Sequence, residues 1–254
     1  MIKEYVIYTA IFNNYDKLIN FNIKNSKIDF LCFTDDKTLK SNFWNIIFID
    51  ENDDPKFINR KIKFLPHKYL KKYHMSLYID GNIKLLSDPI KIFQKYSQKL
   101  ISAPLHPERE CIYDEAKFLT QNKILYEKNI IKQITMLKDN KYPKNYGLNE
   151  LNIILRKHND KSVIEAMNEV WNFFIKFPTR DQLIFNFVMW KNNLAVETIV
   201  ENSRLKNIFF RAVPHNKNYS ILRKLFNIFW YRRYHNKVFK FIAKFILKFF
   251  MIFK

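Results

Sequence analysis

Glycine is almost absent from this chain: of its 254 residues, only Gly81 and Gly147 are glycine. A Walker loop or a GxGxxG dinucleotide fingerprint needs several closely spaced glycines, because its backbone turns tightly and approaches phosphate groups. The sequence therefore excludes kinase-type and NAD-type chemistry on their usual scaffolds. Phosphate binding through a metal ion or through basic side chains remains open.

Positive charge is concentrated towards the C-terminus. The formal net charge is +20, from 44 Lys and Arg against 24 Asp and Glu. No acidic residue follows Glu201, and residues 204–254 carry 13 Lys and Arg, so the first 203 residues hold 31 basic against 24 acidic residues, a net +7. A nucleic-acid-binding protein would interleave arginine and aromatic residues across a folded face, so this distribution argues against one.

The N-terminal segment and the cysteines predict a cytoplasmic protein. Residues 1–16 have Glu4 near the start, a short apolar run and no small-residue cleavage site, unlike a signal peptide. Cys32 and Cys111 lack CxxC spacing, so we expect buried thiols and neither a zinc site nor a disulfide framework. The chain also lacks a run of about 18 uncharged apolar residues, which a conventional membrane-spanning helix would need.

The first half alternates short β-rich runs with helical segments, which is the pattern of an α/β fold with a Rossmann-type sheet. We expect strands at residues 5–12, 28–35, 44–50, 74–83 and 98–106, with 151–159 as a further candidate. We expect helices at residues 58–73, 88–96, 111–139, 162–177 and from 180 onwards. The composition changes near residue 221, which indicates one catalytic domain, residues 1–220, and a helical tail, residues 221–254.

Three of the expected strands end in aspartate, namely Asp35, Asp50 and Asp80. Ligands collect at such carboxyl ends in open α/β sheets. Asp80 stands in YIDGNI (78–83), where an apolar strand is followed by Asp80, Gly81 and Asn82. An Asp-x-Asn step can direct two oxygen ligands at one Mg²⁺ or Mn²⁺, which can also bind the diphosphate of a sugar nucleotide. The alternative is an ordinary Asp-Gly tight turn.

Seven motifs occur in the order found in one known family. They are VIYTAIFNNYDKL (6–18), DFLCFTDD (29–36), a spaced basic run from Arg60 to His67, SLYIDGNI (76–83), HPERECIYDEA (106–116), YGLNE (146–150) and RDQLIFNF (180–187). Residues 4–215 thereby resemble a bacterial and plant family, long catalogued as a domain of unknown function, whose plant members include rhamnogalacturonan I galacturonosyltransferases. The resemblance implies a glycosyltransferase that uses a nucleotide sugar.

More distantly, the chain resembles the retaining, metal-dependent transferases of glycogenin type, whose fold is called GT-A. Their Tyr-Leu-Asp-x-Asp step is similar to residues 78–82 (YIDGN), and their Asp-Gln helix start is similar to residues 180–182 (RDQ). The difference is Asn82, where a neutral amide replaces the second carboxylate as a ligand. The resemblance implies a GT-A-like mixed sheet flanked by helices, a Mn²⁺ or Mg²⁺ ion, and retention of anomeric configuration.

The resemblance also implies which residues bind the nucleotide. Thr9, Ala10 and Phe12 are expected to line its pocket, with Asp35 near the base or ribose. Ordinary roles at a strand end or in a turn are the alternative for each of them.

The diphosphate and its metal ion involve a second group of residues. Arg60 and Lys63 are one turn apart on an expected helix and would neutralise phosphate charge, unless they belong to a solvated helix face. Asp80 and Asn82 are the expected metal ligands. His215 follows a strand-like stretch (208–214) and is our candidate for the third ligand, because imidazole suits Mn²⁺; an exposed or structural histidine is the alternative.

The remaining candidates concern the reacting sugar and the acceptor. Asp181 and Gln182 are expected beside the anomeric carbon, although an aspartate there would also stabilise a helix N-terminus. His106 follows the strand at 98–106, where an acceptor-binding loop would lie, and a turn-capping role is its alternative. Glu115 is a further acceptor candidate, or else part of a solvated helix face.

The tail is both basic and apolar. Lys237, Lys240, Lys244 and Lys248 form one stripe at helical spacing, while aromatic and aliphatic residues fill the wider face. Lysines at this spacing make membrane spanning costly, so we expect a helix in the interface of an anionic membrane, with residues 230–233 (WYRR) at the same depth. The alternative is a helix docked on the protein's own core or on a partner chain.

Together these features predict a peripheral enzyme of polysaccharide biosynthesis on the inner face of the cell membrane. It would transfer a hexose or hexuronate from a UDP-linked sugar to a cell-surface or lipid-linked glycan, with metal and basic residues stabilising the departing diphosphate. The alternatives are a basic nucleic-acid-binding protein and a lipid amide hydrolase, since some plant relatives are described as ceramidases. A metal hydrolase would need a tight ligand cluster such as HxxxH, and the sequence has no HxxxH step.

Overall fold

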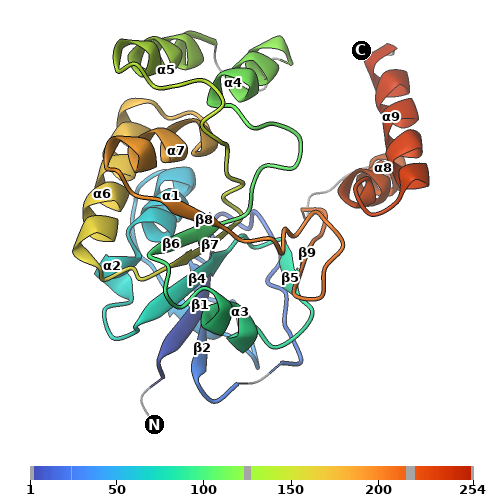
Figure 1. Cartoon of the computed structure of the whole chain (residues 1–254). Helices are drawn as coiled ribbons and strands as arrows, with labels where there is room; N and C mark the ends of the chain where they lie inside the picture. Colours follow the sequence, from blue (N-terminus) through green and yellow to red (C-terminus); the bar gives the residue numbers. More distant parts are fainter. Residues whose placement is uncertain (1–2, 24, 123–126, 216–220, 253–254) are drawn as a thin grey trace.

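A computed structural model of the chain shows an α/β fold built on a seven-stranded sheet (Figure 1). The structure describes residues 3–23, 25–122, 127–215 and 221–252. The strand order is β3-β2-β1-β4-β7-β6-β8. The strands are β1 (Tyr5–Ile11), β2 (Ile28–Thr34), β3 (Asn45–Phe48), β4 (Met75–Ile79), β6 (Ile101–Ala103), β7 (Ile153–Arg156) and β8 (Val196–Thr198).

Strand direction brings the functional ends of the sheet together. Strands β1, β2, β3 and β4 are parallel, and β7 runs antiparallel to both of its neighbours, β4 and β6. In the parallel register Ile11 pairs with Thr34, and Tyr8 pairs with Tyr78. The carboxyl ends of β1, β2 and β4 therefore lie along one edge of the sheet, where open α/β sheets bind ligands.

Both faces of the sheet are buried, which explains why its strands are nearly continuous apolar runs. In β1, Val6 and Tyr8 belong to one hydrophobic core, and Ile7 and Ile11 belong to the other. This division follows from the alternation of side chains along a strand. The two cores fix the register, because a slip by one residue would exchange the two sets of side chains.

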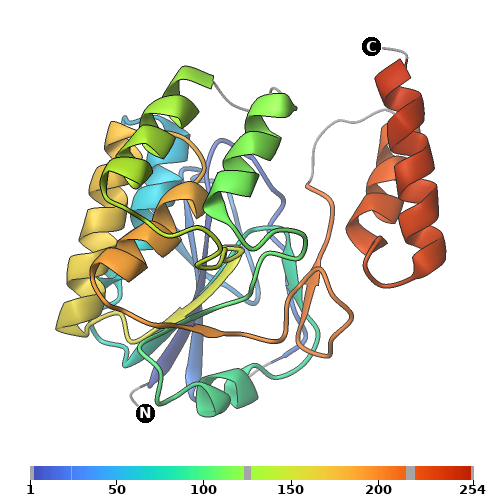
Figure 2. The same ribbon diagram turned by 45° about the horizontal axis from the view of Figure 1, so that its top comes forward.

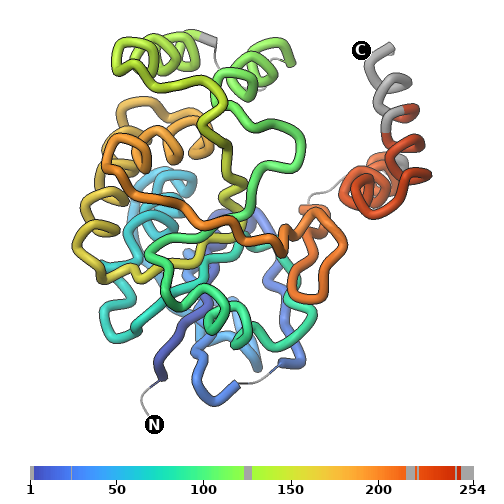
Figure 3. Tube along the Cα trace, in the orientation of Figure 1, coloured from blue at the N-terminus to red at the C-terminus, as the bar shows by residue number. Residues whose placement is uncertain are grey.

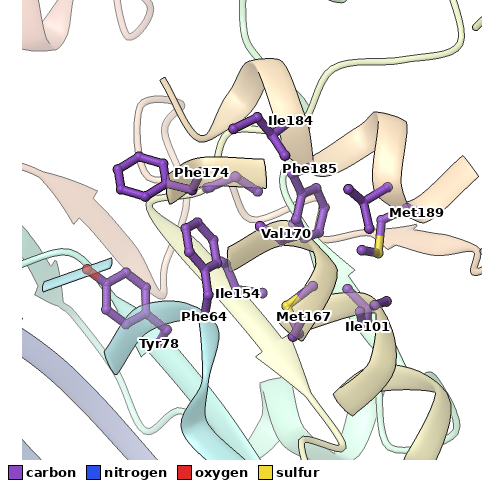
Figure 4. Close-up of a cluster of buried hydrophobic side chains, with 14 of the residues drawn as sticks. Phe64, Tyr78, Ile101, Ile154, Met167, Val170, Phe174, Ile184, Phe185 and Met189 are labelled. Atoms are coloured by element: carbon purple, nitrogen blue, oxygen red, sulfur yellow. The ribbon is translucent and has the colours of Figure 1, made fainter. Parts of the chain in front are cut away.

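Helices cover the first of these faces in a thick layer (Figures 1 and 2). Figure 4 shows Phe64, Phe174 and Phe185 gathered in this core. Asp54 and Asp160 cap two of the helices by accepting hydrogen bonds from first-turn backbone N–H groups. The helices of this face are α1 (Pro55–Phe64), α2 (Pro66–Tyr69), α4 (Ile112–Gln121), α5 (Glu127–Asp139), α6 (Lys161–Lys176) and α7 (Gln182–Lys191).

The opposite face is covered by α3 (Ile90–Lys95) and by a small two-stranded sheet. That sheet pairs β5 (Ile83–Leu85) with β9 (Phe210–Ala212). The strand expected over residues 74–83 is thus two strands in different sheets, separated by a turn at residues 80–82. This turn links the edge of the main sheet to the late strand β9.

Gly81 is required in the turn between β4 and β5 by close packing. A Cβ atom at this position would lie 3.1 Å from Ile11 Cγ1 and 3.2 Å from Asp16 Cβ. Few real Cβ contacts are that tight, so a larger residue would require the side chain of Ile11 or Asp16 to move by a few tenths of an ångström. The glycine therefore lets β1, its loop and the YIDGNI turn approach one another.

The C-terminal tail forms two helices, α8 (Ile221–Arg232) and α9 (Lys237–Ile252), and not the single helix that we expected. They lie side by side at the edge of the α/β body (Figures 2 and 3). Residues 233–236 separate them, and Arg233 there is held by contacts with its neighbours and with the body. No described helix combines the length and apolar character needed to cross a membrane.

The α/β class with a Rossmann-type mixed sheet flanked by helices is confirmed. The short strand β8 was not expected, because its three half-buried residues carry little hydrophobic pattern. The division into a domain at residues 1–220 and a tail at 221–254 stays a prediction.

Candidate active site

A cavity of about 550 Å³ opens at the carboxyl ends of β1 and β4. This volume lies in the range typical of small-molecule and cofactor sites. Four of the thirteen candidate residues, Thr9, Asp35, His106 and Glu115, do not line it. The other nine, drawn from widely separated parts of the chain, do: Ala10, Phe12, Arg60, Lys63, Asp80, Asn82, Asp181, Gln182 and His215.

The turn after β4 presents Asp80 and Asn82 to the cavity. Tyr78 donates a hydrogen bond of 2.9 Å to Asp80 Oδ1, and Asp80 keeps one third of its side chain exposed. Asn82 Nδ2 donates to the carbonyl of Val213 at 2.8 Å, and the N–H of Val213 donates to the carbonyl of Asn82 at 2.9 Å. The amide nitrogen of Asn82 is thereby occupied, which leaves its amide oxygen as the side-chain atom suited to a cation.

His215 enters the same cavity from the segment that follows β9. Its Nδ1 lies 2.9 and 3.0 Å from the two carboxylate oxygens of Asp16. A carboxylate at this distance holds the proton on Nδ1, so the lone pair is on Nε2. Metal-binding histidines are commonly oriented in this way.

The donor set in the cavity fits Mn²⁺ or Mg²⁺ in its chemistry. Asp80 offers a carboxylate, Asn82 an amide oxygen and His215 an imidazole nitrogen, and such ligands suit these metals. Among the described residues no group of three His, Cys, Asp or Glu side chains could hold a metal ion. The fit therefore depends on the amide of Asn82 and on oxygen atoms supplied by a bound substrate.

Lys63 and Asp181 form a buried ion pair at the base of the cavity. Lys63 Nζ lies 2.7 Å from Asp181 Oδ2 and 3.8 Å from Asp80 Oδ1, and Arg60 Nε lies 3.4 Å from Asp181 Oδ2. Burial alone would raise the pKa of Asp181, but Lys63 and Arg60 outweigh it and hold this pKa well below its usual range. Asp181 is therefore ionised and also caps α7 through the N–H of Gln182.

A buried arginine, Arg156, binds the backbone of Lys63. Arg156 of β7 donates a hydrogen bond of 2.6 Å to the backbone carbonyl of Lys63 and another to the hydroxyl of Tyr8. Its guanidinium is completely buried, and burial lowers its pKa. No described carboxylate pairs with Arg156, so these neutral oxygens carry the interaction that anchors the end of α1.

The two acceptor candidates lie behind the cavity wall. His106 Nδ1 accepts hydrogen bonds from the backbone N–H groups of Glu108 and Arg109 at 3.2 and 3.1 Å, which is the turn-capping arrangement. Burial and three nearby arginines lower the pKa of His106 to about 3, so its ring is neutral at physiological pH. Glu115 is fully buried and pairs with Arg109 and with Arg180, at 3.1 Å from Arg180 Nη1. Glu115 thus positions Arg180, which does line the cavity.

Thr9 and Asp35 are also outside the lining. Thr9 lies within β1 at 1% exposure, and its hydroxyl has no hydrogen-bond partner in the described part of the chain. Asp35 accepts two hydrogen bonds, of 2.9 and 3.0 Å, from the backbone N–H of Asn13. Asn13 and Asn14 have φ angles of 52° and 49°, so Asp35 holds a left-handed turn that borders the cavity.

Several lining residues were not found from the sequence. Asn59 donates to the carbonyl of Ala10 at 2.7 Å, and Arg204 pairs with Glu150. Glu150 lies in the YGLNE motif and could have been found there. Three buried acceptor atoms on the lining have no hydrogen-bond partner among the described residues: Glu150 Oε2, Asn152 Oδ1 and Gln182 Oε1.

The His158-x-Asp160 step, which resembles a metal-binding pattern, is structural. His158 Nε2 lies 2.9 Å from the carbonyl of Leu70, and burial lowers the pKa of His158 to about 4. Asp160 caps α6 by accepting from the N–H groups of Ser162 and Val163. Neither residue lines the cavity.

Comparison with known proteins identifies a family and structurally similar proteins. A family model described as "TOD1/MUCI70, glycosyltransferase-like domain" matches residues 2–215. A search of curated proteins finds no match. Among solved structures, the crystal structure of mouse xyloside xylosyltransferase 1 in its apo form is similar with a TM-score of 0.45 and 9% identity, over 80% of this chain and 86% of that chain.

Proposed function

Because the chain belongs to the TOD1/MUCI70 glycosyltransferase-like family, we propose that it transfers a hexose or hexuronate from a UDP-linked sugar to a glycan of the cell surface. The observation that carries this proposal is the composition of one cavity. It combines three potential metal ligands with a cationic base at the carboxyl edge of the sheet. A nucleoside diphosphate sugar needs both, because its diphosphate is an anion that binds a divalent cation.

In the proposed complex, Asp80, Asn82 and His215 hold Mn²⁺ or Mg²⁺. The ion supplies Lewis-acid stabilisation of the diphosphate as it departs from the sugar. Asp16 contributes indirectly, because it fixes the tautomer and orientation of the His215 ring.

Lys63 and Arg60 provide the protein's own charge for the leaving group. Lys63 is only 2% exposed, so its charge acts through a medium that screens less than water does. Asp181 keeps both cations in place before substrate arrives, and such preorganised charge needs no rearrangement during the reaction. Their combined role is to stabilise the nucleoside diphosphate as negative charge develops on it.

The sugar is assigned to the side of the cavity formed by Gln182, Glu150 and Asn152. Each has a buried acceptor oxygen without a partner among the described residues, and buried acceptors of this kind are costly unless a ligand donates to them. Sugar hydroxyl groups are suitable donors. Asp181 and Gln182 would then lie beside the anomeric carbon, and transfer with retention follows by analogy with glycogenin-type enzymes.

The acceptor is assigned to the loop that carries His106 and to the neighbouring residue Arg180. Glu115 acts there by holding Arg180 in the cavity wall. We place the enzyme at the inner face of the cell membrane, where the basic tail would contact anionic lipid and the acceptor would be a surface or lipid-linked glycan.

A panel of nucleotide sugars tests the proposal. We expect UDP and at least one UDP-sugar to raise the melting temperature in the presence of Mn²⁺, with a smaller rise in EDTA. The same UDP-sugar should be slowly hydrolysed without an acceptor. If no nucleotide raises the melting temperature with either metal, the transferase assignment is wrong.

A further inference from the structure

We propose that the α8–α9 pair is a seat for an anionic lipid bilayer and, at the same time, part of the rim of the active-site cavity. The inference rests on the proposed function for the role of the cavity, but not for the lipid surface. The partner is a lipid bilayer rich in anionic headgroups.

The first observation is the exposed face of α9. Val238, Phe241 and Phe245 are 59, 72 and 65% exposed and recur at i, i+3 and i+7, so they lie on one side of the helix. The other side packs against α8, where Phe239 meets Phe229 at a ring-centroid distance of 5.6 Å and Ala243 is completely buried. An unsupported apolar face this strongly exposed is typical of a surface that binds another apolar phase.

The second observation is the charge beside that face. Lys237 and Lys240 are exposed on α9, and by helical spacing they flank the side that carries Phe241. Lys244 and Lys248 continue this stripe in the sequence, but their side chains lie outside the described residues. No acidic residue follows Glu201, so nothing in this part of the sequence offsets the attraction to anionic headgroups. Each lysine near such a surface adds to this attraction.

An anionic bilayer suits this combination better than a protein partner does. Apolar side chains flanked by lysines favour a helix that lies in the interfacial plane, with its rings among acyl chains and its ammonium groups at the phosphates. A spanning arrangement would bury lysines at mid-membrane, which is costly for each of them. The surplus of positive charge also disfavours a second copy of this chain as the occupant, because like charges would face each other.

The third observation connects this seat to the cavity. Tyr231, near the end of α8, lies 6.4 Å from the ring of His215, with the two rings at 81°. The guanidinium of Arg204 lies 5.9 Å from the same tyrosine ring. His215 and Arg204 both line the cavity, so α8 supports its rim directly.

Contacts of Arg233, two residues after Tyr231, fix the position of the α8–α9 pair. Arg233 is 8% exposed, stacks 3.8 Å from the ring of Trp230, and lies 3.4 Å from Glu108 Oε1. Glu108 belongs to the same loop as His106, which we assign to the acceptor. That residues 230–233 lie at membrane depth stays a prediction; for Arg233, Trp230 and Glu108 give its guanidinium partners within the protein.

Chain length then sets how far the cavity can be from the lipid. Lys237, the first residue of α9, is six positions after Tyr231, and six extended steps of the chain span roughly 20 Å. With α9 in the interfacial plane, the rim of the cavity lies within about this distance of the headgroups. The active site is thus held beside the bilayer surface.

The lipid seat is tested by sedimentation of the full chain with vesicles. The wild type should pellet with vesicles of phosphatidylcholine and phosphatidylglycerol at 7:3, but not with phosphatidylcholine alone. The double variant F241E/F245E should lose at least tenfold in partitioning. The matched control I131E/I175E places the same charges on exposed positions of α5 and α6 and should pellet like the wild type.

Two results would overturn the lipid seat. One is pelleting of F241E/F245E equal to that of the wild type. The other is a wild-type dimer in size-exclusion chromatography with light scattering that F241E/F245E converts to monomer, with no vesicle binding by either protein. In that case the exposed face of α9 is a protein interface.

The rim is tested separately by UDP affinity in the presence of Mn²⁺. Tyr231→Ala should weaken UDP binding by roughly threefold to tenfold in calorimetry, the size expected when an aromatic support beside a cation is lost. Tyr231→Phe should restore it, and both variants should still pellet with anionic vesicles. If Tyr231→Ala binds UDP as tightly as the wild type does, α8 does not support the rim of the cavity. If the wild type does not bind UDP at all, the proposed function is refuted, and the vesicle result still stands.

Discussion

Lys63 Nζ and Asp181 Oδ2 are 2.7 Å apart in an ion pair whose side chains are only 2% and 8% exposed. The pair joins α1 to the start of α7 across 118 residues of sequence. Burying two charges costs solvation energy, which their attraction and the nearby Arg60 offset. This arrangement would hold the ammonium group of Lys63 oriented at the base of the cavity before an anionic leaving group forms there.

Substituting Asp181 by asparagine should therefore affect both stability and catalysis. Asp181→Asn keeps a good helix cap for α7 but leaves the ammonium of Lys63 buried without its main counter-charge. Removing one partner of a buried pair typically costs about 3–5 kcal/mol. We expect a clear fall in the free energy of unfolding in urea and a lower turnover of UDP-sugar.

The pH dependence of this variant supplies its control. The pKa of Asp181 is depressed in the folded state, so its stabilising effect is complete above the unfolded value near 4 and is lost as the pH falls through the lower folded value. The stability difference between wild type and Asp181→Asn should be constant from pH 8 to about 5 and shrink below pH 4. A difference that grows on acidification would contradict the ion-pair assignment.

Asp80 should be indispensable for transfer, because it is the carboxylate of the proposed metal site. We expect Asp80→Ala to lower the rate of UDP-sugar turnover by at least about a hundredfold, on the scale of a lost electrostatic contact to the transition state. Asn82→Ala should be milder, since it removes a neutral ligand. Asp50→Ala is the matched control, because Asp50 also follows a strand but is exposed and does not line the cavity. Full activity of Asp80→Ala at saturating donor would show that the site is assigned wrongly.

Asp16 should govern metal affinity without binding the metal itself. Its carboxylate holds His215 Nδ1 at 2.9 Å, and loss of such a supporting group usually costs tenfold to a hundredfold in affinity. We expect Asp16→Asn to weaken Mn²⁺ binding by about that factor in a titration followed by electron paramagnetic resonance with UDP present. Asp16→Glu should recover part of it. Equal Mn²⁺ affinity in wild type and Asp16→Asn would remove His215 from the proposed ligand set.

The sequence revealed the parts of the site that follow from local pattern. Asp80 and Asn82 were found because a buried strand ends directly before them, and Asp181 because it begins an apolar helix. Asp16 was missed because its partner, His215, is 199 residues away. Glu150 and Arg204 are likewise joined only by the fold.

The places where the structure differs from these expectations have similar causes. Thr9 was expected to line the cavity, but it lies two residues before the end of β1 and is only 1% exposed. His106 and Glu115 stay acceptor candidates, but neither lines the cavity, because the arginines packed against them decide which side chains reach it. Periodicity predicted a helical tail but not the break after Arg232, where Arg233 contacts Glu108, a residue far away in the sequence.

Buried neutral histidines should make the protein sensitive to mild acid. Burial lowers the pKa of His158 from 6.5 to about 4, so between these values the unfolded chain binds a proton that the folded chain does not. Stability then falls as the pH decreases from 6.5 towards 4, by about 1.4 kcal/mol per unit and roughly 3 kcal/mol in total for this residue. His106 adds to the same trend, since its pKa is lowered to about 3.

We expect urea unfolding to show a steep loss of stability over this range. His158→Gln, which can still donate to the carbonyl of Leu70, should show a shallower loss. His74→Gln, at an exposed position, is the control and should follow the wild type. If His158→Gln loses stability as steeply as the wild type between pH 6.5 and 4, then His158 is not the buried neutral group that the structure indicates.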